Sequence, residues 1–229
     1  MWMIRMVWVV LLAPVVILAL RLSIFDPNAR DIDCFEAQTA FEVQDYSGAL
    51  PVEPALLIGN QRVKHWTETP EMLGGQAVLK RTLGGLTPKL LDECFTRLVG
   101  YYQPSRLILL LDTEGIETRR VDDLLNDLSG IMAQRSLYGL RFEMTIIAPI
   151  TSPRVSSTLA GQLSELRNAL KDWSKETLGT QYLGVDDLFS DDTQAINTDY
   201  FWPDGNTLTD VGYKKLTAWL ISLSNERQK

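Results

Sequence analysis

The sequence predicts an α/β protein: a three-layer α/β/α sandwich around a five-stranded parallel sheet, preceded by one N-terminal transmembrane helix. Short apolar runs of strand length alternate along the chain with longer segments whose apolar residues recur at helical spacing. Short polar loops join the two kinds of segment. The run Leu107–Leu111 is unbroken, which is typical of a central strand buried on both faces of a sheet.

The predicted membrane segment lies in residues 1–25. The run Met6–Leu20 carries no charge, Arg5 and Arg21 flank it, and apolar residues continue to Phe25. About 20 such residues span a bilayer. A cleavable signal peptide is the alternative, but the small-residue cleavage pattern is missing after the run. We expect an uncleaved anchor with a cytoplasmic N-terminus and an exported body, periplasmic in a bacterium.

Composition limits the size of the folded domain and the class of partner. The chain has 229 residues, of which 45% are hydrophobic, enough for one globular domain with a core and an appendage. Its net charge of −7 argues against nucleic acid as the main partner, because phosphate binding needs clustered basic residues. Cys34 and Cys94 could form one disulfide in an oxidising compartment, or both could be free.

After the anchor, residues 26–53 are polar and rich in turn residues, and we interpret them as a juxtamembrane tether with some local structure. Residues 54–229 form the predicted domain. Its expected strands are Ala55–Ile58, Ala77–Leu79, Leu107–Leu111, Met144–Ala148 and Tyr182–Val185. Its expected helices are 88–101, one from Val121 that includes Met132, 156–178, and a last helix that begins near Asp210 as N-cap.

In a parallel sheet of this kind, ligands bind outside the carboxyl ends of the strands. Four loops should therefore meet there. They are Gly59-Asn60-Gln61, Gly84-Gly85, Asp112-Thr113-Glu114-Gly115, and residues 204–213.

The order and spacing of these blocks resemble the SGNH (GDSL-type) hydrolases, esterases and acylhydrolases with a flavodoxin-like sandwich. Gly59-Asn60-Gln61 with Trp66 is similar to the first block, and Gly84-Gly85 to the second, whose glycine supplies an oxyanion-hole N–H. The later blocks are similar to Tyr102-Gln103-Pro104 with the loop at 112–115, Ser152-Pro153-Arg154, and Asp204-Gly205-Asn206-Thr207-Leu208 with Gly212-Tyr213. The resemblance covers roughly Pro54 to Leu223.

The resemblance also shows at which positions this sequence differs from the family pattern. The family's nucleophilic serine falls on Gln61, its asparagine oxyanion donor on Glu114 and its histidine base on Thr207, while Gly85 and Asp204 are retained. Acyl transfer needs an activated nucleophile and donors aimed at the oxyanion. The amide of Gln61 is a poor nucleophile, and Thr207 cannot act as the base that would activate one. An ionised Glu114 would repel the negative charge that develops on the oxyanion.

Three features could give the cleft another chemistry. His65 could act as a base, with Ser152 as the nearest serine by topology. Asp112, Glu114 and Asp204 could share a proton or hold a hard cation, although loop carboxylates more often cap helices or face water, and no further ligands are evident. Aromatic residues could floor a carbohydrate site or could belong to the core: Trp66, Trp173, Trp202 and Tyr213.

The sequence therefore predicts a catalytically inactive, membrane-anchored and exported SGNH-hydrolase-like protein. It would act as a binding or scaffold subunit of a membrane or envelope complex, with membrane-protein partners, no cofactor and no metal. The alternative is an active carboxyl-ester hydrolase, for example a glycan O-acetyl esterase, with a rearranged site. A third hypothesis is a module that binds a small molecule or glycan in the vacated cleft.

Overall fold

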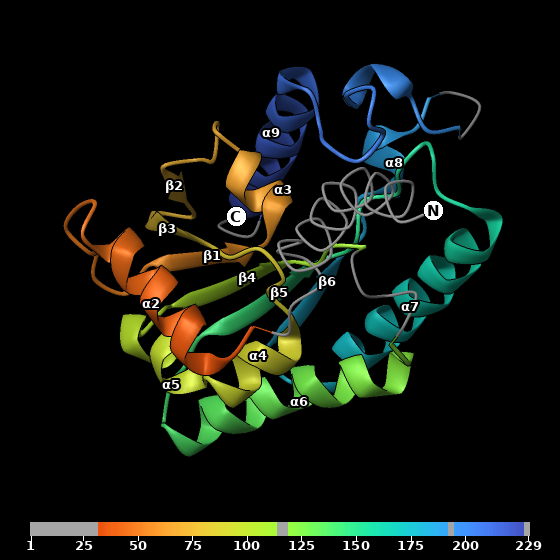
Figure 1. The fold of residues 1–229 in the computed structure, drawn as a ribbon. Coiled ribbons are helices and arrows are strands. Elements are labelled where there is room, and N and C mark those ends of the chain that lie inside the picture. Colours follow the sequence, from red (N-terminus) through yellow and green to blue (C-terminus); the bar gives the residue numbers. More distant parts are fainter. Residues whose placement is uncertain (1–31, 114–118, 192–194, 227–229) are drawn as a thin grey trace, which may run out of the picture.

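The computed structural model describes residues 32–113, 119–191 and 195–226. These residues form a six-stranded sheet between two layers of helices (Figure 1). The strands are β1 (Ala55–Gly59), β2 (Met72–Leu73), β3 (Gln76–Thr82), β4 (Arg106–Leu110), β5 (Glu143–Ile147) and β6 (Thr180–Leu183).

The sheet has the order β2-β3-β1-β4-β5-β6. All neighbouring pairs are parallel except β2 with β3, which is antiparallel. Numbered by chain order, the five parallel strands follow the flavodoxin-like order 2-1-3-4-5, so the topological switch point lies between β1 and β4. Gln61, at the start of α3, and Asp112 follow these two strands, and the switch point is where an α/β sheet binds its ligands.

The five predicted strands are all present, but the predicted total of five is wrong. The sixth strand, β2, arises because Gly74 and Gly75 both adopt positive φ angles, 57° and 79°, and turn the chain back on itself. Met72 and Leu73 then pair with Ala77 and Gln76 at the sheet edge.

One helical layer contains α2, α4, α5, α6 and α7, whose apolar residues form a core with one face of the sheet (Figure 1). The helices of this layer are α2 (Cys34–Asp45), α4 (Pro88–Glu93), α5 (Phe95–Leu98), α6 (Val121–Leu137) and α7 (Ser157–Glu176), with the 3₁₀ turn η1 (Gly100–Tyr102) after α5.

The other face of the sheet packs against the remaining helices, and this second core includes Trp66, Phe189 and Leu216. Its helices are α3 (Gln61–His65), α8 (Asp186–Phe189) and α9 (Asp210–Glu226), with η2 (Thr198–Tyr200) between the last two. The N-cap of α9 is Thr209 instead of the predicted Asp210, because Thr209 Oγ1 accepts from Gly212 N–H at 3.3 Å.

The predicted helix over 88–101 is instead three short pieces. The chain leaves the α-helical region at Cys94, with φ −109° and ψ 21°, and again at Val99, with φ −126° and ψ −57°. Apolar spacing does not reveal such breaks, because the residues on both sides still face the same core.

Helix α2 lies within residues 26–53, the range interpreted as a tether. Ala37 and Phe41 are fully buried in the core, and a disulfide joins Cys34 to Cys94. The segment from Cys34 to Asp45 is therefore part of the folded domain.

Within the described residues, no helix has the length and apolar content needed to cross a membrane. The predicted anchor, residues 1–25, lies outside the described residues.

Candidate functional site

The candidate site begins where β1 turns into α3. Gly59 is needed at this turn because a Cβ atom there would collide with the Val63 side chain and would lie 3.2 Å from the Leu110 carbonyl oxygen. The close turn places Gln61 as the first residue of α3. Its side-chain amide nitrogen would lie 3.1 Å from a Cβ at Gly84. The structure therefore brings together Gln61 and the glycine loop after β3, where Gly85 has a φ of +73°.

The second part of the site is the loop that precedes α9. Asp204 Oδ1 accepts from the N–H groups of Asn206 and Thr207 at 2.8 and 2.9 Å, and Asp204 Oδ2 accepts from Thr207 Oγ1 at 2.7 Å. Slight burial opposes ionisation of Asp204, but these hydrogen bonds and nearby Arg154 keep its pKa below the ordinary value. Both oxygens of the Asp204 carboxylate therefore accept hydrogen bonds from residues of its own loop.

Ser152, the serine considered as an alternative nucleophile, is buried behind this loop. Its hydroxyl donates to the Gly205 carbonyl oxygen at 2.5 Å and accepts from Arg154 N–H at 3.1 Å. A serine nucleophile must donate to a general base, whereas this hydroxyl donates to a carbonyl group. Ser152 therefore joins the loop after β5 to the loop before α9.

Gly205 is required where these loops meet. Its φ is +75°, and a Cβ there would lie 2.8 Å from Cγ and Cδ of Arg154. The Arg154 side chain thus packs directly on the Asp-Gly turn, beside Asp204.

Arg62 lies beneath the site and is nearly fully buried. Its Nη1 donates to the Ile150 carbonyl oxygen at 2.9 Å, and its Nε lies 3.7 Å from Asp112 Oδ1. The Tyr213 hydroxyl donates to the Arg62 carbonyl oxygen at 2.9 Å. One residue therefore connects the loops after β1, β4 and β5 with α9.

Burial raises the pKa of Tyr213 to about 12; Arg62 lowers it in part, and Asp112 and Asp204 raise it. Tyr213 is accordingly a neutral hydrogen-bond donor at physiological pH. Sequence reasoning missed the role of Arg62, because arginine is usually exposed and no local pattern indicates burial.

Two polar atoms near Arg62 have no hydrogen-bond partner among the described residues, Asn60 Oδ1 and Arg62 Nη2. Both belong to the segment that begins α3. Such atoms are uncommon in folded interiors, and a bound water molecule or ligand is one way to satisfy them.

The structure shows two direct contacts between predicted site residues. Gln61 lies with Gly84, and Asp204 with Thr207; within the described residues, no hydrogen bond joins Gln61 to Thr207. Glu114 lies outside the described residues. His65 is exposed at the end of α3.

A metal centre finds no support in the described part of the chain. Among residues 32–113, 119–191 and 195–226, no three His, Cys, Asp or Glu side chains group as metal ligands would. The proposed carboxylate cluster of Asp112, Glu114 and Asp204 includes one residue outside these ranges.

The aromatic residues considered for a carbohydrate site differ in their surroundings. Trp66 is fully buried, donates from Nε1 to Thr217 Oγ1 at 2.8 Å and stacks on Tyr213. Trp173 is on α7 and donates to Ser129 Oγ at 3.0 Å. Trp202, in contrast, is 53% exposed and lies two residues before Asp204.

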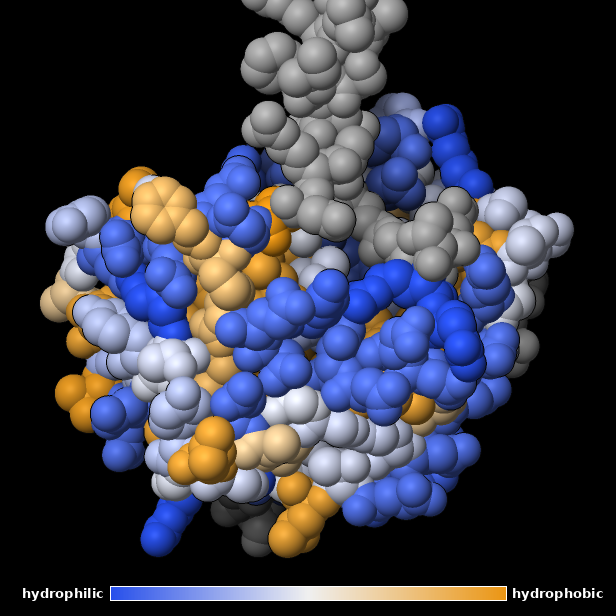
Figure 2. All heavy atoms as spheres, turned by 60° about the horizontal axis from the view of Figure 1, so that its bottom comes forward, coloured by the Kyte–Doolittle hydropathy of each residue, from blue (hydrophilic) through white to orange (hydrophobic). Residues whose placement is uncertain are grey.

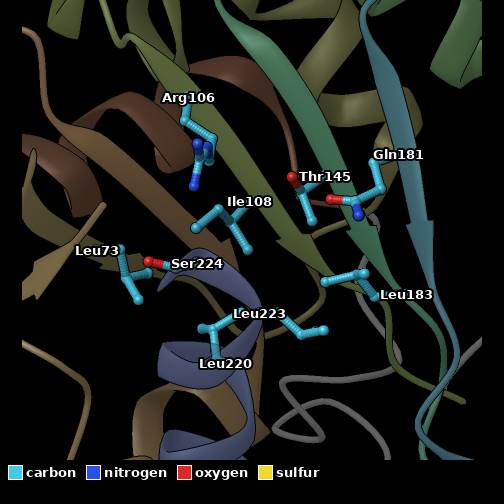
Figure 3. A pocket seen from close by; sticks show the side chains of 9 residues that line it. All are labelled: Leu73, Arg106, Ile108, Thr145, Gln181, Leu183, Leu220, Leu223 and Ser224. Carbon is cyan, nitrogen blue, oxygen red and sulfur yellow. The ribbon is translucent and has the colours of Figure 1, made fainter. Parts of the chain in front are cut away.

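A small cavity lies elsewhere, under the C-terminal end of α9, where Arg106, Thr145 and Gln181 of neighbouring strands face Leu220 and Leu223 (Figure 3). Its volume is about 20 Å³, room for roughly one water molecule. Arg106 and Gln181 are near the starts of their strands, so this cavity is not part of the candidate site.

Comparisons with known proteins show the fold. No family model matches the sequence, and no curated protein matches it. A solved GDSL-like lipase from Bacteroides thetaiotaomicron VPI-5482 is similar in structure, with a TM-score of 0.68, 13% identity, and coverage of 83% of this chain and 98% of the lipase.

Two further solved structures are similar. A protein from Streptococcus pneumonia, provisionally described as a platelet activating factor, has a TM-score of 0.66 and 20% identity, covering 91% of this chain and 99% of that chain. A catalytic mutant of an acetylxylan esterase from Geobacillus stearothermophilus has a TM-score of 0.58 and 10% identity, covering 75% and 94%. The chain therefore has the fold of the GDSL-type hydrolases, as its sequence motifs predict.

Proposed function

We propose that this chain is a membrane-anchored, exported member of the SGNH-hydrolase fold that has lost ester hydrolysis and acts as an accessory subunit of a membrane or envelope complex. The hydrogen bond from Thr207 to Asp204 carries the proposal. In the hydrolases that the sequence resembles, this aspartate orients a histidine base. Here it is capped by the hydroxyl of a residue that cannot act as a base.

The rest of the site supports the same conclusion. Gln61 replaces the nucleophile and lies against Gly84, in the glycine loop that would supply the oxyanion-hole N–H. In a comparable triad, loss of the nucleophile or of the base alone lowers kcat by about 10⁶-fold. Both groups are replaced in this chain.

Export and anchoring rest on two observations. The run Met6–Leu20 has no charged residue, and Cys34 and Cys94 form a disulfide. Disulfides persist in oxidising compartments, which favours an exported domain. We infer that the N-terminal segment holds this domain at the membrane, where its partner would also be found.

Purification from detergent-solubilised membranes tests the proposal directly. We expect the full chain to co-purify with a defined set of membrane proteins and to lack turnover of short p-nitrophenyl esters. Ester turnover that a Gln61→Ala or Asp204→Ala change abolishes would contradict the loss of catalysis.

The second candidate function is an ester hydrolase with a rearranged site, which is favoured by the lipase and acetylxylan esterase among the structural neighbours. A fluorophosphonate probe distinguishes it, because a serine nucleophile would form a covalent adduct that mass spectrometry can locate. We expect no site-specific adduct, because Ser152 is buried and bonded to Gly205.

A further inference from the structure

Helix α2 has two apolar faces. Its inner face carries Ala37 and Phe41, which are fully buried in the domain core. Its outer face carries Phe35, Thr39 and Val43, and the C-cap residue Tyr46, which also has helical backbone angles, continues this face. Their spacing of i, i+4, i+8 and i+11 brings them onto one side of a helix. Phe35 is 78% exposed and Tyr46 90% exposed.

Thr39 does not interrupt this outer stripe. Its hydroxyl donates to the Phe35 carbonyl oxygen at 2.8 Å, so the side-chain donor is satisfied within the helix. Leu50 and Val52, in the segment after α2, are also exposed apolar residues. On the face in Figure 2, hydrophobic residues are more frequent on the left, the side on which Figure 1 shows α2 and α5.

Two contacts and a disulfide hold α2 rigidly to the domain, so its outer face has a fixed direction. Cys34 is bonded to Cys94 at the first turn. At the last turn, Gln44 pairs with Thr82, and Asp45 binds Arg81. Whatever the stripe contacts, it therefore orients the whole domain.

The position of α2 in the chain indicates what covers this stripe. The apolar run of the sequence ends at Phe25, and only the eight residues 26–33 separate it from Cys34. Even fully extended, they span at most about 29 Å. If the run is anchored as proposed, α2 must lie close to the membrane surface. Phenylalanine and tyrosine are residues that membrane interfaces favour.

We propose that the outer stripe of α2 (Phe35, Thr39, Val43 and Tyr46) lies on the lipid bilayer surface and fixes the orientation of the domain. This inference rests on the anchoring in the proposed function. Glu36 and Glu42 flank the stripe, and Glu42 lies 3.8 Å from Arg97 Nε. The contact is therefore apolar, does not require anionic lipid and resists salt.

The test uses the full chain in phosphatidylcholine nanodiscs that contain a lipid with a photoreactive acyl chain. After irradiation, reduction and trypsin digestion, mass spectrometry maps the lipid adducts. Residues 31–62 form one peptide between Arg30 and Arg62, which separates α2 from the anchor. We expect adducts in this peptide, unchanged in high salt.

The variant pair Phe35→Glu and Tyr46→Glu should lower the adduct yield in this peptide about tenfold, because charged groups are unfavourable in the interface. The matched control is Leu137→Glu with Leu178→Glu, which changes two other strongly exposed apolar residues. The control should leave the yield unchanged.

The outcomes separate the two proposals. A chain that does not stay with the nanodisc would contradict the proposed anchoring. A chain that stays, but gives no adduct in residues 31–62, would overturn the α2 inference alone. If a second copy or another protein covered the stripe, lipid adducts would be absent from residues 31–62 although the chain stayed with the nanodisc, and this result would overturn the inference in the same way.

Discussion

The side-chain amide of Gln44 pairs with the backbone of Thr82 in both directions. Gln44 Nε2 donates to the Thr82 carbonyl oxygen at 2.8 Å, and Thr82 N–H donates to Gln44 Oε1 at 3.0 Å. Thr82 is the last residue of β3, and the loop with Gly84 beside Gln61 follows it. Helix α2 is thus attached to the strand end that carries part of the candidate site.

The change Gln44→Glu should destabilise the domain. It removes the donor to the Thr82 carbonyl oxygen and places a carboxylate beside it, which should cost about 1 to 3 kcal/mol in the free energy of unfolding. Urea denaturation followed by circular dichroism measures this. Gln38→Glu, on the same helix, is the control and should change stability by less than about 0.5 kcal/mol. Equal effects of the two changes would mean that the Thr82 pairing contributes nothing.

Asp45 should contribute more than Gln44, because it is a partly buried anion between two arginines. Its carboxylate accepts from Arg81 Nε at 2.8 Å and from Arg97 Nη2 at 2.5 Å. Asp45→Asn removes the nearest counter-charge of both arginines, which should cost about 3 to 5 kcal/mol in the free energy of unfolding.

Glu42→Gln is the matched control for Asp45→Asn. Glu42 is also close to Arg97, but its side chain is 58% exposed, so the change should cost at most about 1 kcal/mol. The unfolding midpoints of both variants in guanidinium chloride give the comparison. Similar losses for the two would contradict a dominant role for Asp45.

Removal of the disulfide tests the covalent attachment of α2. Cys34 and Cys94 are 60 residues apart in the chain, and cross-links over loops of this size typically add about 2 to 4 kcal/mol of stability. The double change Cys34→Ala and Cys94→Ala should lower the thermal midpoint, and dithiothreitol should lower that of the unchanged protein in the same way. If dithiothreitol also lowered the midpoint of the double variant, its effect would not come from this bond.

Apolar patterning predicted every parallel strand. Its signal is strongest for β1, β4 and β5, which are mostly buried runs such as Leu107–Leu110, whereas most residues of β3 and β6 are half-buried. It missed β2, which has one buried residue, Leu73, although the Gly74-Gly75 pair is a recognisable turn signal. It also missed α2, which buries only two residues and is held by Gln44, Asp45 and the disulfide. Partners distant in the sequence leave no periodic pattern.

For the candidate site, sequence reasoning indicated the loops but not their contacts. The pairing of Asp204 with Thr207 is local, and a turn pattern with a carboxylate three residues before a hydroxyl could have predicted it. The position of Arg62 could not be predicted, because its partners Ile150 and Asp112 come from other strand ends.

Asp92 should make stability depend on pH. Burial and, next, Asp127 raise the pKa of its carboxyl above the ordinary value, although Gln134 lowers it in part through a hydrogen bond. In the window between the unfolded and the raised folded pKa, the folded protein binds more protons than the unfolded protein. Stability from this group is therefore highest below the window and is lost as the pH rises through it.

Asp92→Asn should remove this loss. Compared with the unchanged protein, the variant should be more stable at pH 7 than it is at pH 4, and this gain should be less than about 1 kcal/mol because the carboxyl is partly exposed. Glu165→Gln, which changes an exposed carboxylate on α7, is the control. Thermal unfolding of both variants across this pH range gives the answer. If Asp92→Asn were more destabilising at pH 7 than at pH 4, relative to the unchanged protein, the raised pKa assigned to Asp92 would be wrong.

Ser152→Ala distinguishes a structural serine from a catalytic one. The change leaves the Gly205 carbonyl oxygen and the Arg154 N–H without their partner in a buried position, which should cost about 1 to 3 kcal/mol. Ser174→Ala is the control, because that hydroxyl is exposed and should contribute less than about 0.5 kcal/mol.

The same Ser152→Ala variant should leave any background ester turnover and any fluorophosphonate labelling unchanged. A hydroxyl that donates to a carbonyl oxygen has no base to accept its proton during attack on an ester. Loss of labelling without loss of stability would reverse this conclusion and favour a hydrolase with a rearranged nucleophile. Loss of stability without a change in labelling is the expected result, because it follows from a serine whose hydroxyl joins the loop after β5 to the loop before α9.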